Sequence, residues 1–545
     1  MGVFAAVSRF KLFAQGRTAR RARRCWSILA GAGLALSAAT LASGHDMGMD
    51  MGAVGHVHLA STCAPAAQRQ IDRGAGFLYS FMYDEARRSF QEAAAAQPAC
   101  ALAHWGQAMS DWQQVEGLPT GDLRAAAQRE IAAAQSASQG SAREKAYVAA
   151  LNLIYQVSPT KDEDRLKAYS RSMGALAARY PGDRQAPVIY ALSLLSLSDY
   201  DPDLIYRRKA LTILNRALTR EPHNPGIIHF IIHASDNPGM ARYGLAAARQ
   251  YAKVAPASAH ARHMPGHIFA RLGFWRDDIS SNLASKAAAE APGVAHTEAQ
   301  NRLHALEFLQ YAYLQLGDVD KAREMTREAA AIAPTEVSPG FDGYYAWVQA
   351  SLPARFDLET GDWRAALGLS ASETANVFAK RSIFWAHAVA AGHLGDAAAG
   401  AQAMADYRAT LSAGEGEKSP STQQKEVEAW ALFAQGRTDE AVAELGPVAD
   451  AQDRVGKGEV ELPAREMMGD MLRLAGRPAQ ALNAYSASLK ADPGRFNTLL
   501  HAAQSASASG DARLAMLLRR RLLDNARHPT GAARDALSGL RGLAS

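Results

Sequence analysis

The chain has 545 residues, of which 48% are hydrophobic and 21% charged, a composition typical of folded proteins rather than of disordered or membrane-embedded ones. Its net charge of +5 comes from residues 1–44, which hold seven Arg and Lys side chains and no acid, so the remaining chain has a net charge of −2. This near-neutral remainder gives no reason to expect a nucleic-acid partner or an anionic membrane. The length suits several domains or one long repeat array.

Residues 1–44 have the pattern of a secretory signal peptide. A basic segment precedes an apolar run from Trp26 to Ala42, and small residues follow it. The run is short for a membrane span and lacks a stop-transfer flank. We expect cleavage after Ala42 or Gly44 and a periplasmic or secreted mature chain with no transmembrane span. An uncleaved N-terminal anchor is the alternative.

Residues 45–63 are expected to form a flexible leader, because they show no periodic apolar face. The leader is rich in His and Met, whose imidazole and thioether groups together suit copper, and Cu(I) in particular. The candidate copper ligands are His45, Met47, Met49, Met51, His56 and His58. A biased composition without metal binding is the alternative interpretation.

Two cysteines remain in the mature chain, because Cys25 would leave with the signal peptide. An even number of cysteines in an exported protein favours pairing. We therefore predict a disulfide between Cys63 and Cys100, with two separate buried thiols as the alternative.

The rest of the chain reads as helical hairpins. In residues 67–100, small Gly74 and large Phe90 allow two helices to pack closely, and Pro98 ends the unit. Similar units are expected at 225–258, 259–292, 303–334 and 462–495, with more diverged helix pairs around Gly361, Gly395 and Gly436. No stretch alternates apolar and polar residues as a half-buried strand does, so the sequence predicts an all-α protein.

Residues 67–100, 225–334 and 462–495 resemble the tetratricopeptide repeat (TPR) family, whose unit is a helix–turn–helix of about 34 residues. The chain also resembles an exported bacterial branch with no established activity, through phrases such as IIHFIIHASDNPGMARYGLAAARQYAKVAP and HARHMPGHIFARLGFW. The resemblance implies a TPR-like right-handed superhelical solenoid over residues 64–530, followed by a C-terminal tail at 531–545. It also implies a protein or peptide partner in the concave groove.

A histidine pair at helical i, i+4 spacing occurs twice, as His229/His233 and as His263/His267. The second pair follows the first by 34 residues, the length of one repeat, so the same face of two neighbouring helices should carry both pairs. Composition alone predicts about one histidine in the window 229–267, where five are present. The histidines therefore form a stripe that composition does not explain.

In the TPR family, positions 2, 5, 9 and 12 of each unit tend to face the concave groove, and the resemblance implies the same here. We apply this rule to units that start at Pro225, Ala259 and Leu303. Three successive groove faces then carry His229, His233 and Asp236; His260, His263 and His267; and His304, Glu307 and Tyr311.

Neutral imidazoles suit Zn, Cu, Ni or Fe(II), and side chains from helices packed about 8–10 Å apart can reach one ion. We therefore expect a site for Cu or Zn in the groove. Its predicted ligands are His229, His233, His263, His267, His260 and Asp236, and its supporting residues are His304, Glu307 and Tyr311. An organic or peptide ligand, and purely structural polar packing, are the alternatives.

The sequence thus favours an exported TPR-type binding or scaffold protein whose groove holds a transition metal, with a role in metal homeostasis or delivery. A metal-dependent hydrolase is the second hypothesis, in which Glu307 or Asp236 moves a proton of a metal-bound water. A plain protein–protein interaction scaffold is the third. The sequence contains no P-loop, HExxH, GxSxG or CxxC motif, so we favour binding over catalysis.

Overall fold

The computed structural model describes residues 54–115, 117–137, 140–156, 161–291, 298–337, 341–371, 375–411, 420–458 and 460–542. All regular elements in these ranges are helices, and successive helices pack against one another as pairs. The prediction of an all-α, TPR-like solenoid is therefore confirmed. The expected signal peptide (1–44) and His45, Met47, Met49 and Met51 lie outside the described residues.

The N-terminal half contains α2 (Pro65–Tyr79), α3 (Tyr83–Ala96), α4 (Ala101–Ser110), α5 (Gly121–Ser136), α6 (Ala142–Tyr155), α7 (Asp162–Arg179), α8 (Gln185–Leu195), the short 3₁₀ helix η2 (Ser198–Tyr200), α9 (Ile205–Leu218), α10 (Pro225–Ser235), α11 (Ala241–Val254), α12 (Ala259–His263), α13 (Pro265–Leu272) and α14 (Trp275–Ala289). The C-terminal half contains α15 (Glu298–Gln315), α16 (Val319–Ala330), η3 (Pro334–Glu336), α17 (Asp342–Thr360), α18 (Trp363–Gly368), α19 (Val377–Leu394), α20 (Ala397–Ala409), α21 (Thr422–Ala434), α22 (Thr438–Val455), α23 (Ala464–Leu474), α24 (Pro478–Ala491), α25 (Phe496–Ala508), α26 (Ala512–Asn525) and α27 (Gly531–Gly542).

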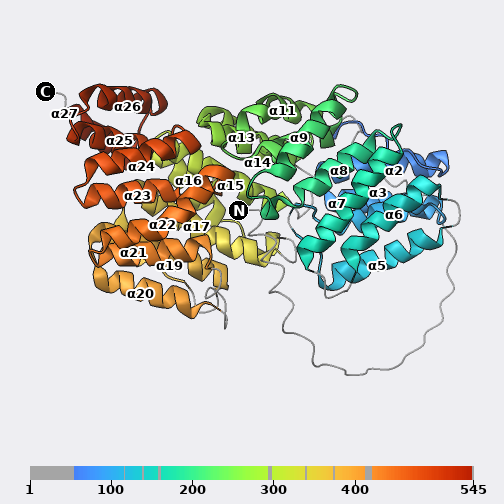
Figure 1. Cartoon of the computed structure of the whole chain (residues 1–545), viewed down its shortest axis with the longest axis horizontal. Helices are drawn as coiled ribbons and strands as arrows, with labels where there is room; N and C mark the ends of the chain where they lie inside the picture. The colour runs from blue at the N-terminus through green and yellow to red at the C-terminus, as the bar shows by residue number, and fades with distance from the viewer. Residues whose placement is uncertain are drawn as a thin grey trace, which may run out of the picture.

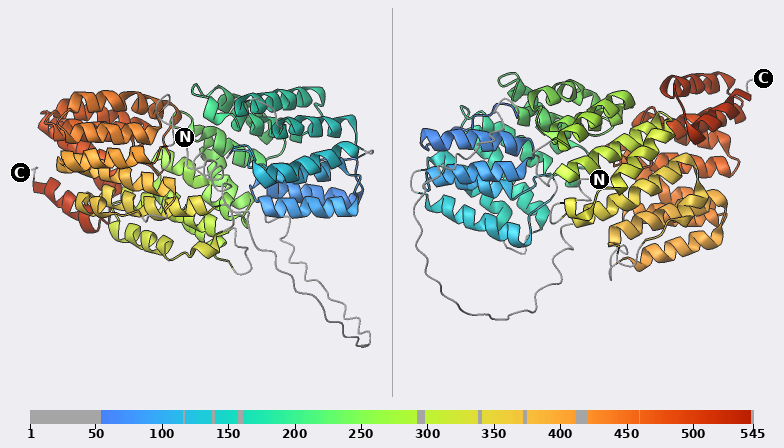
Figure 2. Two further views of the ribbon diagram at one scale, coloured as in Figure 1. Left: turned by 90° about the horizontal axis from the view of Figure 1, so that it is seen from below. Right: turned by 180° about the vertical axis from the view of Figure 1, so that it is seen from behind.

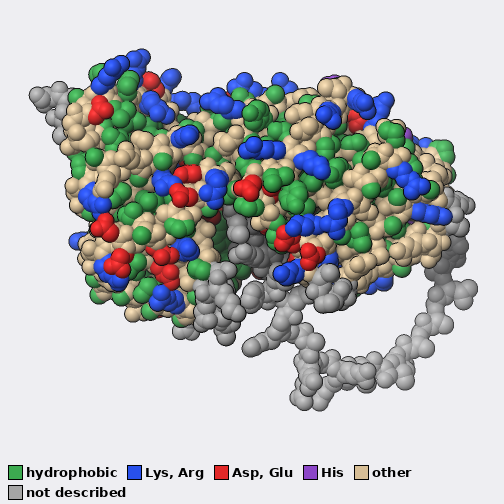
Figure 3. Space-filling view, viewed as in Figure 1, with side chains coloured by type: hydrophobic (Ala, Val, Ile, Leu, Met, Phe, Trp, Pro, Cys, Tyr) green, Lys and Arg blue, Asp and Glu red, His purple; other side chains and the backbone are tan. Residues whose placement is uncertain are grey.

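The helices form an elongated array in which α10–α17 lie between the two ends (Figure 1, Figure 2). Helices α2–α9 make one end and α19–α27 the other. Acidic and basic side chains are both spread over the face shown in Figure 3, and histidine shows only at its upper edge. Most of the predicted site residues lie on α10–α17, between the two ends of the array.

Small residues bring the paired helices together as the sequence predicts. A Cβ added to Gly74 would lie 2.9 Å from the Phe90 ring, and one added to Gly106 would lie 2.2 Å from it. The first unit therefore depends on glycine at the point where its helices cross. The same device recurs at Gly469, whose added Cβ would lie 2.4 Å from the Tyr485 ring.

Two segments are more ordered than the sequence predicts. Residues 54–63, expected to belong to a flexible leader, pack onto the array because Val54 and Leu59 are apolar and 1% exposed. Residues 531–542, expected to be part of a tail, form α27 and contact α16. The apolar Ala533 and Leu537, four residues apart, give α27 the buried face that a tail would lack. No helix among the described residues is both long and apolar enough to cross a membrane.

The predicted disulfide between Cys63 and Cys100 is present, with their Cα atoms 5.5 Å apart. It joins the segment before α2 to the residue that precedes α4. The covalent bond therefore closes the first helical hairpin.

Changing both Cys63 and Cys100 to Ser should lower the free energy of unfolding by about 4 kcal/mol, the entropic estimate for a loop of this length. The two cysteines are 37 residues apart, so the unfolded chain gains substantial freedom when the bond is absent. Denaturant unfolding of the double variant, compared with the oxidised wild-type chain, measures the loss. An unchanged unfolding midpoint would contradict a structural role for this disulfide.

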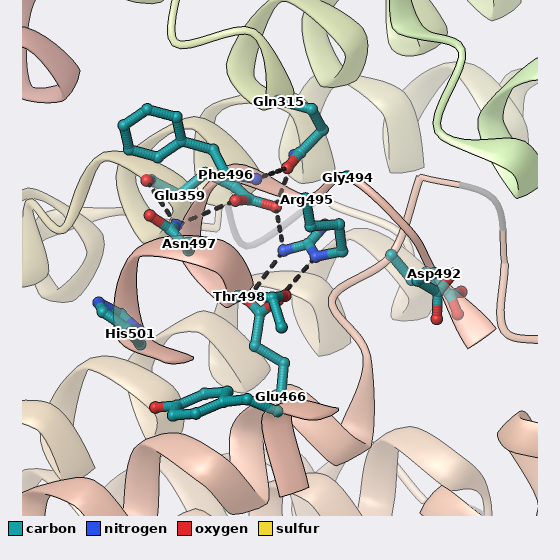
Figure 4. A network of polar contacts seen from close by, with 12 residues as sticks. Gln315, Glu359, Glu466, Asp492, Gly494, Arg495, Phe496, Asn497, Thr498 and His501 are labelled. Carbon is teal, nitrogen blue, oxygen red and sulfur yellow. Dashed lines mark hydrogen bonds and ion pairs between the residues drawn. The ribbon is translucent and has the colours of Figure 1, made fainter. Parts of the chain in front are cut away.

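A buried ionic network fixes the C-terminal helices against the middle of the array (Figure 4). The guanidinium of Arg495, which is fully buried, donates to Glu466 Oε2 at 2.7 Å and to Glu359 Oε1 at 2.8 Å. It also donates to the hydroxyl of Tyr311. These partners lie on α23, α17 and α15, so one side chain joins three helices to the start of α25.

Replacing Arg495 with Met should lower the free energy of unfolding by about 3–5 kcal/mol, because two buried carboxylates lose their counter-charge. Urea unfolding measures the difference. The matched control is Arg477→Met, since Arg477 pairs with Asp439, whose side chain is 86% exposed; that change should cost less than about 1 kcal/mol. Equal effects of the two substitutions would show that the network does not stabilise the fold.

Candidate metal centre

Six histidines from α10, α12, α13 and α15 gather in the middle of the array. They form two groups of three, which we name trio A (His229, His233 and His260) and trio B (His263, His267 and His304). Within each trio, one ring nitrogen from every histidine lies within 4.8 Å of those of the other two. The sequence predicts a single shared site, whereas the structure brings the same side chains together as two neighbouring ones.

Trio A depends on how α10 begins. Asn224 caps this helix by accepting hydrogen bonds from the backbone N–H groups of Gly226 and Ile227, and Pro225 at the first position suits the cap. A Cβ added to Gly226 would lie only 2.4 Å from the Tyr79 ring. Glycine here allows α10 to lie directly against the end of α2, and this contact supplies a partner for trio A.

That partner is a backbone carbonyl. His229 Nδ1 lies 2.7 Å from the carbonyl oxygen of Tyr79, and since a carbonyl only accepts, Nδ1 must carry the proton. The other ring nitrogen of His229, Nε2, therefore presents a lone pair. It lies 3.0 Å from His233 Nε2 and 3.1 Å from His260 Nε2.

The repeat that carries trio B is broken at Pro265. The sequence predicts one helix through both histidines, but the structure ends α12 at His263 and begins α13 at Pro265, because proline cannot donate to the preceding turn. The break preserves the pair, since His263 Nε2 and His267 Nε2 lie 3.0 Å apart.

Both nitrogens of that 3.0 Å contact are lone pairs when the rings are neutral. His263 Nδ1 donates to the amide oxygen of Asn282 at 2.6 Å, and His267 Nδ1 donates to Asp236 Oδ2 at 3.1 Å. With each Nδ1 protonated, neither neutral ring has a hydrogen on Nε2. The contact is therefore repulsive unless a cation, either a proton or a metal ion, lies between the two nitrogens.

Burial disfavours a proton on four of the six rings, whereas the Asp236 carboxylate, 3.1 Å from His267 Nδ1, favours one on His267. Burial lowers the pKa of His229, His233, His260 and His263 well below the usual value near 6.5, and the neighbouring histidines lower the pKa further. A metal ion fits the spacing of the ring nitrogens as well. Two nitrogens bound to one ion at about 2.0–2.1 Å are separated by about 2.9–3.4 Å.

The acidic side chains near the trios lie behind the rings rather than among the ligand atoms. Asp236, predicted as a ligand, accepts from His267 Nδ1 and pairs with Arg271 at 2.9 Å. Glu307 accepts from the Tyr344 hydroxyl at 2.6 Å, and its Oε2 is 3.4 Å from His304 Nδ1. Carboxylates in such positions orient imidazoles and make them better ligands.

Asp278 on α14 adds a buried carboxyl beside trio B. Its Oδ1 accepts from Asn282 at 2.6 Å, and its Oδ2 is buried with no hydrogen-bond partner among the described residues. Burial raises its pKa well above the usual value near 4, while nearby His267 acts in the opposite direction. A cation bound at trio B would stabilise the ionised form of this carboxyl.

One phenylalanine covers each trio. The Phe81 ring centroid lies 4.5, 5.5 and 5.5 Å from those of the three trio A imidazoles, and Phe308 lies 4.6–5.2 Å from those of trio B. Phe81 has a φ of +55°, a left-handed conformation that is costly for a bulky residue. The fold thus tolerates backbone strain at the residue that places an apolar ring on trio A.

The other predicted residues lie elsewhere. Tyr311 belongs to the Arg495 network rather than to either trio, and its ring packs against Trp275. Of the N-terminal copper candidates within the described residues, both His56 and His58 are exposed, and His58 Nδ1 bonds to Asp72.

Several residues of the centre could not be identified from the sequence. Phe81 and the Tyr79 carbonyl approach from about 150 residues away in the chain, and no local pattern marks them. Asp278 and Asn282 did leave a signal, because they are polar and four residues apart on a helix that follows a histidine pair. His304 was predicted only as a supporting residue, although it occupies the same repeat position as His260.

Neither a protein family nor a curated protein sequence matches this chain. Among solved structures, it is similar to the TPR domain of P58(IPK), with 15% identity over 65% of this chain and 98% of that one and a TM-score of 0.19. It is also similar to Naa15/Naa10 bound to HypK-THB (13% identity, 88% and 86% covered, TM-score 0.25) and to the human IFIT1 dimer with m7Gppp-AAAA (11%, 86% and 92%, 0.28). Likenesses this weak carry no argument about function.

Gly266→Ala should destabilise the protein by about 1–3 kcal/mol through overpacking. A Cβ at this position would lie 2.7 Å from both Asn282 Nδ2 and Asp278 Oδ1, the groups behind trio B. The matched control is Gly539→Ala, where an added Cβ meets nothing within 4 Å inside α27; it should stabilise by roughly 0.5–1 kcal/mol. Thermal unfolding measures both, and a Gly266→Ala protein as stable as the control would contradict this packing.

Proposed function

We propose that this chain is an exported, TPR-like binding protein that holds transition metal ions, copper or zinc, at trio A and trio B. The TPR-like solenoid is the scaffold that stacks the histidine helices in register. The observation that carries the proposal is the convergence of Nε2 lone pairs at 3.0–3.1 Å while the Nδ1 atoms of His229, His263 and His267 are already bonded.

The alternatives predicted from the sequence fit this arrangement less well. A peptide carboxylate or another anionic ligand needs hydrogen-bond donors, but neutral His229, His263 and His267 present only acceptors at Nε2. Structural packing without a cation would leave the lone pairs of His263 and His267 facing each other in a buried site. Such uncompensated polar contacts are costly in a protein interior.

A metal-dependent hydrolase is the second candidate, favoured by the number of ligands. Each trio offers three imidazoles, and sites with three protein ligands keep a position open for water or substrate, whereas structural zinc sites are closed by four. Asp236, which the sequence suggests as a base, is held by Arg271 and His267. Glu307, the other base that the sequence suggests, accepts from Tyr344, and Asp278 is a further buried carboxyl near His267.

Export and delivery complete the proposal. Residues 1–44 support export through their signal-like pattern, and the Cys63–Cys100 disulfide supports an oxidising compartment. A protein partner in the concave groove, which repeat arrays of this kind commonly bind, would receive or deliver the metal.

Metal analysis of the mature full chain tests the proposal. The leader candidates His45, Met47, Met49, Met51, His56 and His58 are first changed to Ser, so that only the trios are measured. After loading with Cu(I) or Zn(II) and dialysis, we expect two ions per chain by elemental mass spectrometry. His260→Gln and His304→Gln should each reduce the ratio to one, because each removes one ligand from a single trio.

The control for these variants is His104→Gln. His104 bonds to Glu130 at 2.8 Å and to the Pro98 carbonyl at 3.0 Å, outside both trios, so this change should leave two ions bound. Circular dichroism checks that every variant remains folded. A leader-silenced chain that binds no metal, or equal binding by all three variants, would overturn the proposal.

A further inference from the structure

The two trios share one short helix. His260 and His263 lie three residues apart on α12, on neighbouring positions of one helix face, and belong to different trios. Their ring centroids are 6.4 Å apart. Because one helical turn rises by about 5.4 Å, ions bound at the two trios would lie on the order of one turn apart.

The two sites are copies of one design. Each takes an i, i+4 pair from one repeat unit and one histidine from the second position of the next unit, His260 for trio A and His304 for trio B. Each also has a single phenylalanine in contact with all three rings. Stacking of the repeat has therefore placed two equivalent three-nitrogen sites next to each other.

We propose that the two trios hold two copper ions as one dinuclear centre, and that a small external ligand of two or three atoms bridges the pair. This inference rests on the proposed function, because it requires both trios to bind metal. It adds that the two ions act together and that their shared ligand comes from outside the protein.

The ligand count supports an external bridge. Three imidazoles per ion leave a coordination position unfilled, and the neighbouring carboxylates are engaged behind the rings: Asp236 bonds His267 Nδ1, and Glu307 accepts from Tyr344. Phe81 and Phe308 cover one side of each trio with apolar surface. A ligand of two or three atoms has the length needed to join two ions that lie on the order of one helical turn apart.

Charge favours copper over zinc for such a pair. Two monovalent ions at a given separation repel each other about fourfold less than two divalent ions. The ligand atoms are all imidazole nitrogens, so no ligand carboxylate offsets the charge. Cu(I) therefore occupies two adjacent neutral sites at a smaller electrostatic penalty than Zn(II).

Dioxygen is a two-atom ligand that a pair of Cu(I) ions can reduce. Each Cu(I) gives one electron, so dioxygen is reduced to bound peroxide and both ions become Cu(II). The oxygen–oxygen bond order falls from two to one, no proton is taken up, and no other reductant is needed for the step.

Electron paramagnetic resonance of the leader-silenced full chain tests the pairing. The protein is loaded with Cu(II), since Cu(I) itself gives no signal; bound copper is counted by elemental mass spectrometry, and the signal is compared before and after addition of azide, a three-atom bridging probe. We expect two Cu(II) ions per chain with little paramagnetic signal, because a bridge couples their spins. His304→Gln and His260→Gln, each with one copper, should instead give a full signal of one spin per chain.

The outcomes separate this inference from the proposed function. Two bound coppers that give a signal of two independent spins, with or without azide, would overturn the dinuclear centre and leave metal binding intact. A chain that binds no copper would overturn both. A silent pair in the wild-type chain, together with signals in both single-site variants, supports the inference.

Discussion

Hydrogen bonds from Nδ1 are the constraint on which the candidate centre depends. An imidazole can offer a lone pair toward a neighbour only if its proton is held on the opposite nitrogen. The fold meets this condition three times with three different acceptors: a backbone carbonyl for His229, a side-chain amide for His263 and a carboxylate for His267. The histidines recur at equivalent positions of successive repeat units, whereas the groups that accept from their Nδ1 atoms do not. A different acceptor therefore sets the tautomer of each ring.

Glycine makes two of those acceptors reachable. Gly226 allows the end of α2, with the Tyr79 carbonyl, to approach α10, and Gly266 allows Asn282 of α14 to approach α13. Any larger side chain at either position would push the acceptor away from the histidine that it holds. The small residues of a TPR-like repeat are usually read as packing devices, and at these two positions they also determine the chemistry of the rings.

The sequence predicts the histidine stripe well and its division poorly. The 34-residue offset and the family's groove positions identify five of the six trio histidines as candidate ligands and His304 as a neighbour. The sequence did not show that the histidines divide into two sites. The division arises because His260 and His304, at the second position of their units, each lie next to the histidine pair of the preceding unit.

What escaped prediction depends on contacts between distant hairpins. Phe81, which follows α2, reaches trio A because α2 packs against α10, a contact between distant segments that no local pattern encodes. Residues 54–63 are similar, since a Cβ added to Gly55 would lie 2.9 Å from Pro225 and 3.1 Å from Val254, far along the chain. Pro265 is visible in the sequence, but the family pattern favours a continuous helix at this position. Only the structure shows that His263 and His267 stay 3.0 Å apart despite the break.

The Arg495 network and the histidine trios are two buried polar regions of this protein, and they differ in where the positive charge comes from. Around Arg495, the protein supplies its own cation, and two buried carboxylates and a tyrosine surround it. Around the trios, the charged side chains lie in an outer layer, where Arg271 already pairs with Asp236. The inner layer consists of imidazole rings whose Nε2 atoms converge near the buried carboxyl of Asp278. An inner layer of acceptors backed by carboxyl groups is the electrostatic complement of a cation, and the chain places none of its own there among the described ligand atoms.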